Sequence, residues 1–400
     1  MVNLPKPDLE DLRARAAQRP RQINLPKLPF DIRWPELPET NFLALQEWMP
    51  TLVHVLRRFM PDEYAQRRLE NLWARGTEFL GCKYAILGGA MTWVSEANLV
   101  AAISNAGGFG VLASGSMPPE FLRVEIQKTR EKTSQPFGVN LITMHPQLDA
   151  LIKICGEEKI SHVVLAGGLP TVASIKKLKE HGCKVIAFAP ALVLAKKLIK
   201  SGVDALVIEG HEAGGHIGPV STSVLAQEIL PHIKEVPVFV AGGIGRGEAI
   251  AQYLEMGASG VQLGTRFVCA AECIAHPKFK QAFIKAEARD ATPSVQIDPR
   301  FPVIPVRGVQ NEGTKNFTEM QLSVIKKYES GELDMKAAQL EIEHFWAGAL
   351  RRAVVDGDVE TGSVMAGQSV GMVKKIEPCA DIIGELVAQT LVTLALQTKI

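Results

Sequence analysis

Residues 84–263 alternate between short apolar runs and longer amphipathic segments, and this alternation constrains the fold more than any other feature of the chain. The apolar runs are rich in Val, Ile, Leu and Ala and predict eight buried strands, at 84–88, 110–113, 137–141, 162–166, 184–189, 204–208, 236–241 and 260–263. Seven amphipathic segments between them predict helices, at 96–106, 119–132, 147–158, 172–181, 192–200, 221–232 and 246–256. Eight such units favour an α/β fold of the closed (β/α)8 TIM-barrel type over an open doubly wound sheet.

The sequence outside this repeat predicts three further regions. Residues 1–75 are expected to form an N-terminal extension, consisting of a proline-rich arm followed by two helices split at Pro61. The barrel is assigned to 76–270, and 271–350 is expected to be a helical insertion packed over one end of it. Residues 351–400 are expected to form a glycine-rich loop and a closing helix from about 379 to 397.

Composition excludes several classes of function. The formal net charge is +1 with the two signs interspersed, which gives no reason to expect nucleic acid or an anionic membrane as a partner. The N-terminus shows no signal peptide, and no uncharged run of 18 apolar residues predicts a membrane span. The six cysteines are scattered without a Cys-x-x-Cys pair, which favours reduced, buried thiols and no metal site. A cytoplasmic protein is therefore predicted.

The segment 209–218, Glu-Gly-His-Glu-Ala-Gly-Gly-His-Ile-Gly, directly follows the sixth predicted strand. Its four glycines are expected to exclude helix and regular sheet and to leave a bare backbone that can approach a ligand. The loop carries two imidazoles, His211 and His216, and two carboxylates, Glu209 and Glu212. Histidine titrates near neutrality and suits proton transfer, so this pattern predicts a functional loop. The alternative is a tight turn whose histidines bond only to nearby backbone.

The active site of such a barrel lies just after the strands, and most of these positions are rich in glycine here. Gly242 and Gly243 follow strand 7, and Gly264 and Thr265 follow strand 8, where backbone N–H groups at a helix N-terminus predict a phosphate site. A phosphate does not explain the glycines after strands 1, 4 and 6, but a flat ring across the barrel mouth would. The pattern therefore predicts FMN, with a phosphosugar substrate as the alternative.

Several motifs resemble the FMN-dependent nitronate monooxygenases, formerly called 2-nitropropane dioxygenases. The matching segments lie at 88–94, 105–110, 136–140, 209–216, 241–244 and 264–267. Segments 347–350 and 357–368 are further similar to the FMN-dependent enoyl-acyl-carrier-protein reductases of the same family. The chain departs from the family pattern in its first 75 residues and at Ala90, where glycine or proline is commoner.

The resemblance implies a set of site residues. His216 matches the active-site histidine of the family, whereas His211 has no such match and is expected to be structural. Glu209 is expected to bond either the ribityl hydroxyls of the cofactor or loop amides. The other cofactor-binding positions implied are Gly89, Ala90, Met91, Asn140, Gly168, Gly214, Gly215, Gly242, Gly243, Gly264, Thr265 and Gln368.

Three functions fit this sequence. The nitronate monooxygenase interpretation, with His216 as the acid or base toward a nitroalkane or nitronate, is slightly favoured. The alternative is an enoyl-acyl-carrier-protein reductase, for which NAD(P)H would be a second cofactor and an enoyl thioester the substrate. The third is a non-catalytic flavin-binding barrel, against which the histidine loop argues. A small-molecule substrate is expected, and a homodimer stays open.

Overall fold

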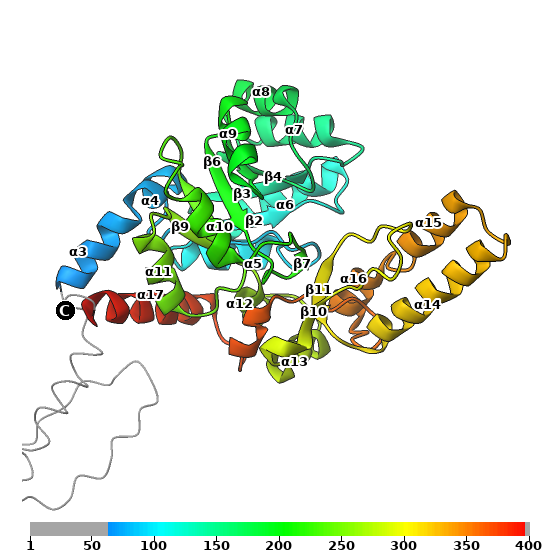
Figure 1. Ribbon diagram of the computed structural model, residues 1–400. Coiled ribbons are helices and arrows are strands. Elements are labelled where there is room, and N and C mark those ends of the chain that lie inside the picture. Colours follow the sequence, from blue (N-terminus) through cyan, green and yellow to red (C-terminus); the bar gives the residue numbers. More distant parts are fainter. Residues whose placement is uncertain (1–62, 397–400) are drawn as a thin grey trace, which may run out of the picture. The chain divides into compact units, whose positions relative to one another are not determined.

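The computed structural model describes residues 63–396 of the 400-residue chain (Figure 1). Its centre is an eight-stranded parallel sheet in the order β1-β9-β8-β6-β5-β4-β3-β2. A parallel bridge between Leu87 and Phe109 joins β1 to β2, so that the sheet nearly closes on itself. The predicted (β/α)8 barrel is confirmed.

The strands and helices of the barrel lie within two residues of the predicted bounds at all but one end, because their apolar periodicity is a local signal. The strands are β1 (Ile86–Gly88), β2 (Gly110–Ala113), β3 (Phe137–Ile142), β4 (His162–Ala166), β5 (Lys184–Phe188), β6 (Ala205–Glu209), β8 (Val238–Ala241) and β9 (Gly260–Leu263). The helices are α5 (Ala97–Asn105), α6 (Pro119–Lys132), α7 (Leu148–Glu157), α8 (Val172–Glu180), α9 (Leu192–Lys200), α10 (Thr222–Ile229) and α11 (Gly247–Glu255). The exception is the end of α10, which stops three residues before the predicted 232.

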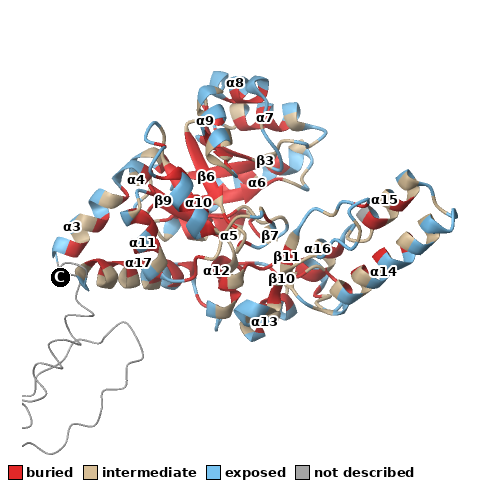
Figure 2. Cartoon of the chain, viewed as in Figure 1, coloured by how far each residue is buried: buried red, intermediate tan, exposed pale blue. Residues whose placement is uncertain are grey.

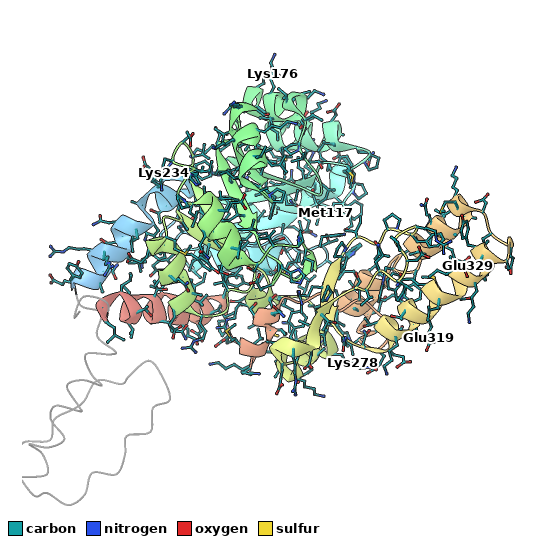
Figure 3. All side chains as sticks on the ribbon, in the orientation of Figure 1. Met117, Lys176, Lys234, Lys278, Glu319 and Glu329 are labelled. Atoms are coloured by element: carbon teal, nitrogen blue, oxygen red, sulfur yellow. The ribbon has the colours of Figure 1, made fainter. Side chains whose placement is uncertain are left out.

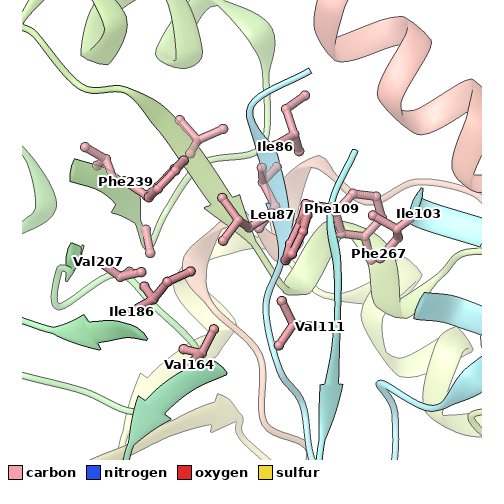
Figure 4. Packing of buried hydrophobic residues seen from close by; sticks show 14 of the residues in the cluster. Ile86, Leu87, Ile103, Phe109, Val111, Val164, Ile186, Val207, Phe239 and Phe267 are labelled. Atoms are coloured by element: carbon pink, nitrogen blue, oxygen red, sulfur yellow. The ribbon is translucent and has the colours of Figure 1, made fainter. Parts of the chain in front are cut away.

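Apolar side chains fill the barrel interior. Leu87, Phe109, Val207 and Phe239 are fully buried and belong to one continuous core cluster (Figure 4). Strands that are covered on both faces read as continuous apolar runs, which is why the sequence showed them without alternation. Most polar side chains of the candidate site are therefore in the loops at the strand ends, and Asn140 is one that lies within a strand.

Helix α4 (Ala74–Leu80) lies at the N-terminal end of the barrel, and helix α3 (Glu63–Leu72) before it packs on α17 (Cys379–Leu396). The carbonyl of Phe79, in α4, accepts hydrogen bonds from His162 Nε2 at 2.8 Å and Lys184 Nζ at 2.7 Å, both at the start of barrel strands. Helix α3 corresponds to the second helix expected for the N-terminal extension. The arm and the first helix expected there lie outside the described residues.

The region after β9 contains more than the predicted helices. It includes α12 (Thr265–Val268), α13 (Pro277–Lys285), α14 (Glu312–Glu329), α15 (Met335–His344) and α16 (Ala349–Arg351), and also the strands β10 (Ala291–Pro293) and β11 (Val306–Val309). Helices α14 and α15 pack around a small apolar cluster of their own, which includes Phe301, Phe317 and Val324 (Figure 2). The region after β9 also contains two short helices, η1 (Ala288–Asp290) and η3 (Gln368–Met372), and a π-helical turn, η2 (Arg352–Asp356). The predicted domain boundaries at 75, 270 and 350 stay predictions.

One expectation about the glycine-rich segment 209–218 is wrong. Gly215 and His216 form a two-residue strand, β7, that pairs antiparallel with β11 in a three-stranded sheet, β10-β11-β7. The glycines were expected to exclude regular sheet. The partner strand lies about 90 residues away, so its hydrogen bonds override the weak local propensity.

The closing helix is α17 (Cys379–Leu396), and it has the length and apolar composition of a membrane-spanning helix. It also carries Asp381 and Glu385, and Glu385 pairs with Arg266 at 2.8 Å. Leu386, Leu391 and the other apolar residues on one face are buried against the barrel, where α17 packs on α11, α5 and α3. These contacts are those of a core helix.

Candidate active site

The histidine loop, residues 209–218, is hydrogen-bonded to neighbouring segments at several positions. The N–H of His211 donates to Val220 O at 2.7 Å, and the carbonyl of Glu212 accepts from the N–H of Gln368 at 2.9 Å. Farther along, the N–H of Ile217 donates to Pro305 O at 3.1 Å. The loop is therefore held by the barrel, by the segment 305–309 and by the segment 366–368. This fixes the direction of the side chains that it carries.

The two histidines of this loop differ in their surroundings. His211 is half-buried, and its Nδ1 lies 3.0 Å from Gly218 O, so its imidazole is bonded within its own loop. The imidazole of His216 is exposed and makes no hydrogen bond to any residue from 63 to 396. The nearby loops still desolvate it, which lowers its pKa below the usual histidine value and keeps it neutral at pH 7. Of the two, His216 is the more exposed and is not bonded within its own loop.

The two carboxylates of the loop also have different environments. Glu212 Oε2 accepts from the N–H of Thr222 at 2.8 Å and from its hydroxyl at 2.9 Å, which binds the loop to the N-terminus of α10. Glu209, the last residue of β6, has no such partner in the described part of the chain. Burial raises the pKa of the Glu209 carboxyl to about 7. Glu209 is thus a polar group at the strand end that a bound ligand could satisfy.

The loops after β8 and β9 carry the features expected of a phosphate cradle. Gly243 has a φ of +75°, and a Cβ atom there would lie 2.9 Å from the Cβ of Glu212. The N–H groups of Gly243 and Ile244 make no hydrogen bond within residues 63–396, so they are free to bind an anion. Thr265 begins α12, and its Oγ1 accepts from the N–H of Gly367 at 3.0 Å. This bond joins the loop after β9 to the segment that contains Gln368.

The loop after β1 lies against the loop after β9. The N–H of Gly89 donates to Leu263 O at 2.8 Å, and a Cβ atom at Gly264 would lie 3.3 Å from the sulfur of Met91. The hydroxyl of Ser95 donates to Gly89 O and accepts from the N–H of Met91, which fixes the turn that also contains Ala90. Residues 89–91 therefore lie beside the loop that follows β9.

The remaining predicted residues lie around the same end of the barrel. Asn140 is inside β3 and buried, with its Nδ2 donating to Val164 O at 3.0 Å, so part of its hydrogen-bonding capacity is already used. Gly168 follows β4 with a φ of +129°, two strands from β6. Gly214 packs on the chain at Gly367, where an added Cβ would lie 2.5 Å from the backbone nitrogen.

Three residues that hold this site were not singled out from the sequence. Ser95 and Thr222 organise the first loop and the histidine loop through the bonds described above. Arg307, in β11, donates from Nε to His211 O at 3.1 Å and is almost fully buried. Ser95 and Thr222 each stand close to the start of a helix, a position where hydroxyl side chains are common. Arg307 has no such local signal, because its partners are distant in sequence.

The sequence that forms these loops matches the model of a known protein family. The family model for nitronate monooxygenase matches residues 74–152 and 147–389, which is most of the chain. The chain belongs to the nitronate monooxygenase family. It is thereby an oxidoreductase of an FMN-dependent class, as the sequence resemblance implied.

Members of the nitronate monooxygenase family and solved structures similar to this chain carry different names. A (3aS,4S,5R,7aS)-5-hydroxy-7a-methyl-1-oxo-octahydro-1H-indene-4-carboxyl-CoA dehydrogenase from Rhodococcus jostii (strain RHA1) is 30% identical over 340 residues, covering 79% of this chain and 95% of the relative. A probable nitronate monooxygenase from Staphylococcus aureus (strain MSSA476) is 26% identical, covering 68% and 90%. The structure of FabK from Thermotoga maritima is 38% identical with a TM-score of 0.73, covering 82% of this chain and 99% of that one.

Proposed function

We propose that the protein is an FMN-dependent, NADH-using reductase of α,β-unsaturated acyl thioesters. The observation that carries this proposal is the chemistry of the barrel mouth on the side of β1 to β5. The loops 89–96, 114–118, 143–147, 167–171 and 189–191 contain one charged residue, Glu96, and its carboxylate accepts from the N–H groups of Asn98 and Leu99 at the start of α5. Such a surface suits an uncharged acyl group better than a small anion, which would need a cation or free N–H groups.

Apolar side chains are exposed on these same loops. Trp93 is 38% exposed, Leu169 is 50% exposed and Met144 is 76% exposed. Met117 lies on the loop after β2 and is labelled in Figure 3. Exposed apolar groups beside a catalytic loop commonly mark a ligand-binding surface. An aliphatic chain bound there would remove these side chains from water.

Two further observations support a thioester. The R. jostii relative is named for a carboxyl-CoA substrate, which is a thioester, and it is alignable over most of this chain. The segment 357–368 is similar to the enoyl-acyl-carrier-protein reductases, and in the structure it lies against the histidine loop through the bond from Gln368 N to Glu212 O. The relatives therefore shift the preference away from the monooxygenase that the sequence alone slightly favours.

The glycine cradle fits FMN. We infer that the phosphate binds the N–H groups of the loops 242–244 and 264–265. The ring would lie against 89–91, Asn140, Gly168 and 214–215, with Gln368 at its edge and Glu209 bonding the ribityl chain. The support for this placement is the unbonded N–H groups of Gly243 and Ile244 and the unpartnered carboxyl of Glu209. When bound, FMN would carry hydride from NADH to the β-carbon of the thioester.

The proton for this reaction comes from the chain. The reaction adds hydride at the β-carbon and a proton at the α-carbon, so NADH, a proton and the enoyl thioester give NAD⁺ and the saturated thioester. His216 is the exposed imidazole of a firmly held loop, and its neutral form predominates at pH 7. It would hold the proton delivered to the α-carbon, and its protonated fraction increases as the pH falls.

The second candidate is a nitronate monooxygenase. It is favoured by the neutral state of His216 at pH 7, because a neutral imidazole can remove a proton from a nitroalkane. The S. aureus relative bears that name at 26% identity. In this case His216 acts as a base rather than as an acid.

The pH dependence of turnover separates the two candidates. If His216 is the acid of a reductase, the rate with NADH and crotonyl-CoA should rise as the pH is lowered from 8 to 6, toward the lowered pKa of His216. If it is the base of a nitroalkane oxidation, the rate with nitroethane should instead fall toward acid. His216→Gln should lower the favoured activity by about 10²–10⁴-fold and remove its pH dependence. A reductase rate that is unchanged in His216→Gln would contradict the proposed role.

A further inference from the structure

Among the described residues, Arg307 is a buried cation without an ion pair, and the Glu212 carboxylate is close enough to interact with its charge. It is 2% exposed and is among the largest fully buried side chains of the described residues. Its Nε donates to His211 O at 3.1 Å and its Nη1 donates to Ala291 O at 2.5 Å. No ion pair to Arg307 occurs within residues 63–396. Burying a charge without an ion partner costs free energy, so the hydrogen bonds of the Arg307 guanidinium must offset that cost.

Arg307 holds the histidine loop at two positions, His211 and Gly215. Its backbone pairs with Gly215 in the β7–β11 ladder, next to the pair between His216 and Val306. Its side chain reaches the carbonyl of His211, which stands five residues before His216. A two-residue strand is too short to be stable by itself. The side-chain bond therefore adds a second attachment that keeps the loop against β11.

The same residue connects the loop to two other segments. Through Ala291 it reaches β10, and its own carbonyl accepts from the N–H of Ala366, in the segment that packs on Gly214. The charged groups on the elements around the loop are Glu209 and Glu212 of the loop itself and Arg307. Arg246 and Arg266 follow the loops 242–244 and 264–265 in the chain. Arg246 is paired with Glu248, and Arg266 is paired with Glu385.

We propose that Arg307 is a positioning residue for His216, which fixes the imidazole at the barrel mouth by joining His211, Gly215 and Ala291 in one hydrogen-bonded node. This inference rests on the role proposed above for His216. The insertion that contains β10 and β11 thereby becomes part of the active site without touching the substrate.

The test uses the full chain and does not require turnover. Arg307→Met removes both side-chain donors, and Arg307→Lys keeps the charge and one of the donors at most. Lys280→Met is the matched control, because Lys280 is also buried and donates to two backbone carbonyls, Ala270 at 2.8 Å and Cys273 at 2.6 Å. The measurements are amide hydrogen exchange over 211–217 and the NMR titration of the His216 ring, assigned with His216→Gln.

In Arg307→Met we expect exchange over 211–217 to become at least about tenfold faster, which corresponds to about 1.4 kcal/mol. The His216 ring should titrate at a higher pH, since a released loop hydrates the imidazole. Arg307→Lys should restore part of both effects, and Lys280→Met should leave both at the wild-type values. Wild-type exchange and titration in a folded Arg307→Met would overturn the proposal. If that variant does not fold, unchanged values in Arg307→Lys would overturn it.

Discussion

Gly243 offers the most direct test of the phosphate cradle. Its φ is +75°, a conformation that costs a residue with a side chain about 1–2 kcal/mol. A Cβ atom there would also lie 2.9 Å from the Cβ of Glu212, whose carboxylate is held by Thr222. Gly243→Ala therefore forces the phosphate loop away from the histidine loop, and overpacking of this kind costs about 1–3 kcal/mol.

The matched control is Gly182→Ala. Gly182 has nearly the same φ, +78°, but no heavy atom lies within 4 Å of its added Cβ, and it precedes β5 at the other end of the barrel. In urea unfolding, Gly182→Ala should lose about 1–2 kcal/mol of unfolding free energy, from its φ alone. Gly243→Ala should lose about 2–5 kcal/mol, because the overpacking adds to the same φ cost. Only Gly243→Ala should weaken FMN binding, by about 5- to 150-fold, measured by quenching of FMN fluorescence. Equal FMN affinity in the two variants would refute the placement of the phosphate.

Two other predictions concern residues around the barrel. His162 is 3% exposed and burial lowers its pKa to about 4, so it is neutral in the folded state and binds a proton on unfolding below about 6.5. Its contribution is fully present above pH 6.5 and is lost as the pH falls to 4, at a cost of about 3 kcal/mol, and the difference between wild type and His162→Gln in urea unfolding at pH 7 and pH 4 checks this. Thr265→Val leaves the N–H of Gly367 without its acceptor and should lower both stability and FMN retention by about 1–3 kcal/mol, measured by urea unfolding and flavin absorbance; unchanged retention would contradict the link between these loops.

The sequence predicted the barrel because its signals are local. Helix α6 has the predicted bounds of 119 and 132, and the strand β9 has the predicted bounds of 260 and 263. The signals are the proline in the first turn of α6 and the apolar residues within each element. The loops of the site follow from the same signals, because a residue after a strand is placed by the strand. The chemical roles of His216 and the cofactor positions were implied by resemblance and stay predictions.

The parts that could not be predicted depend on contacts between distant residues. The sequence gives no sign that Gly215 pairs with Arg307, because the pairing joins segments about 90 residues apart and one of them is rich in glycine. The same is true of Glu212, which was seen as part of a reactive cluster and instead holds the start of α10. The separation of His211 from His216 also becomes visible only when the partner of each ring is known.

His216 and FMN are proposed to act together on a thioester. The measurement that tests it most directly is anaerobic stopped-flow spectroscopy of the FMN-loaded protein. We expect NADH to bleach the flavin absorbance rapidly and stoichiometrically, and crotonyl-CoA added in a second mix to restore it, with the second step slowed in His216→Gln. Slow or absent bleaching by NADH, together with rapid one-electron reduction of the flavin by an alkyl nitronate, would contradict the reductase and establish the monooxygenase.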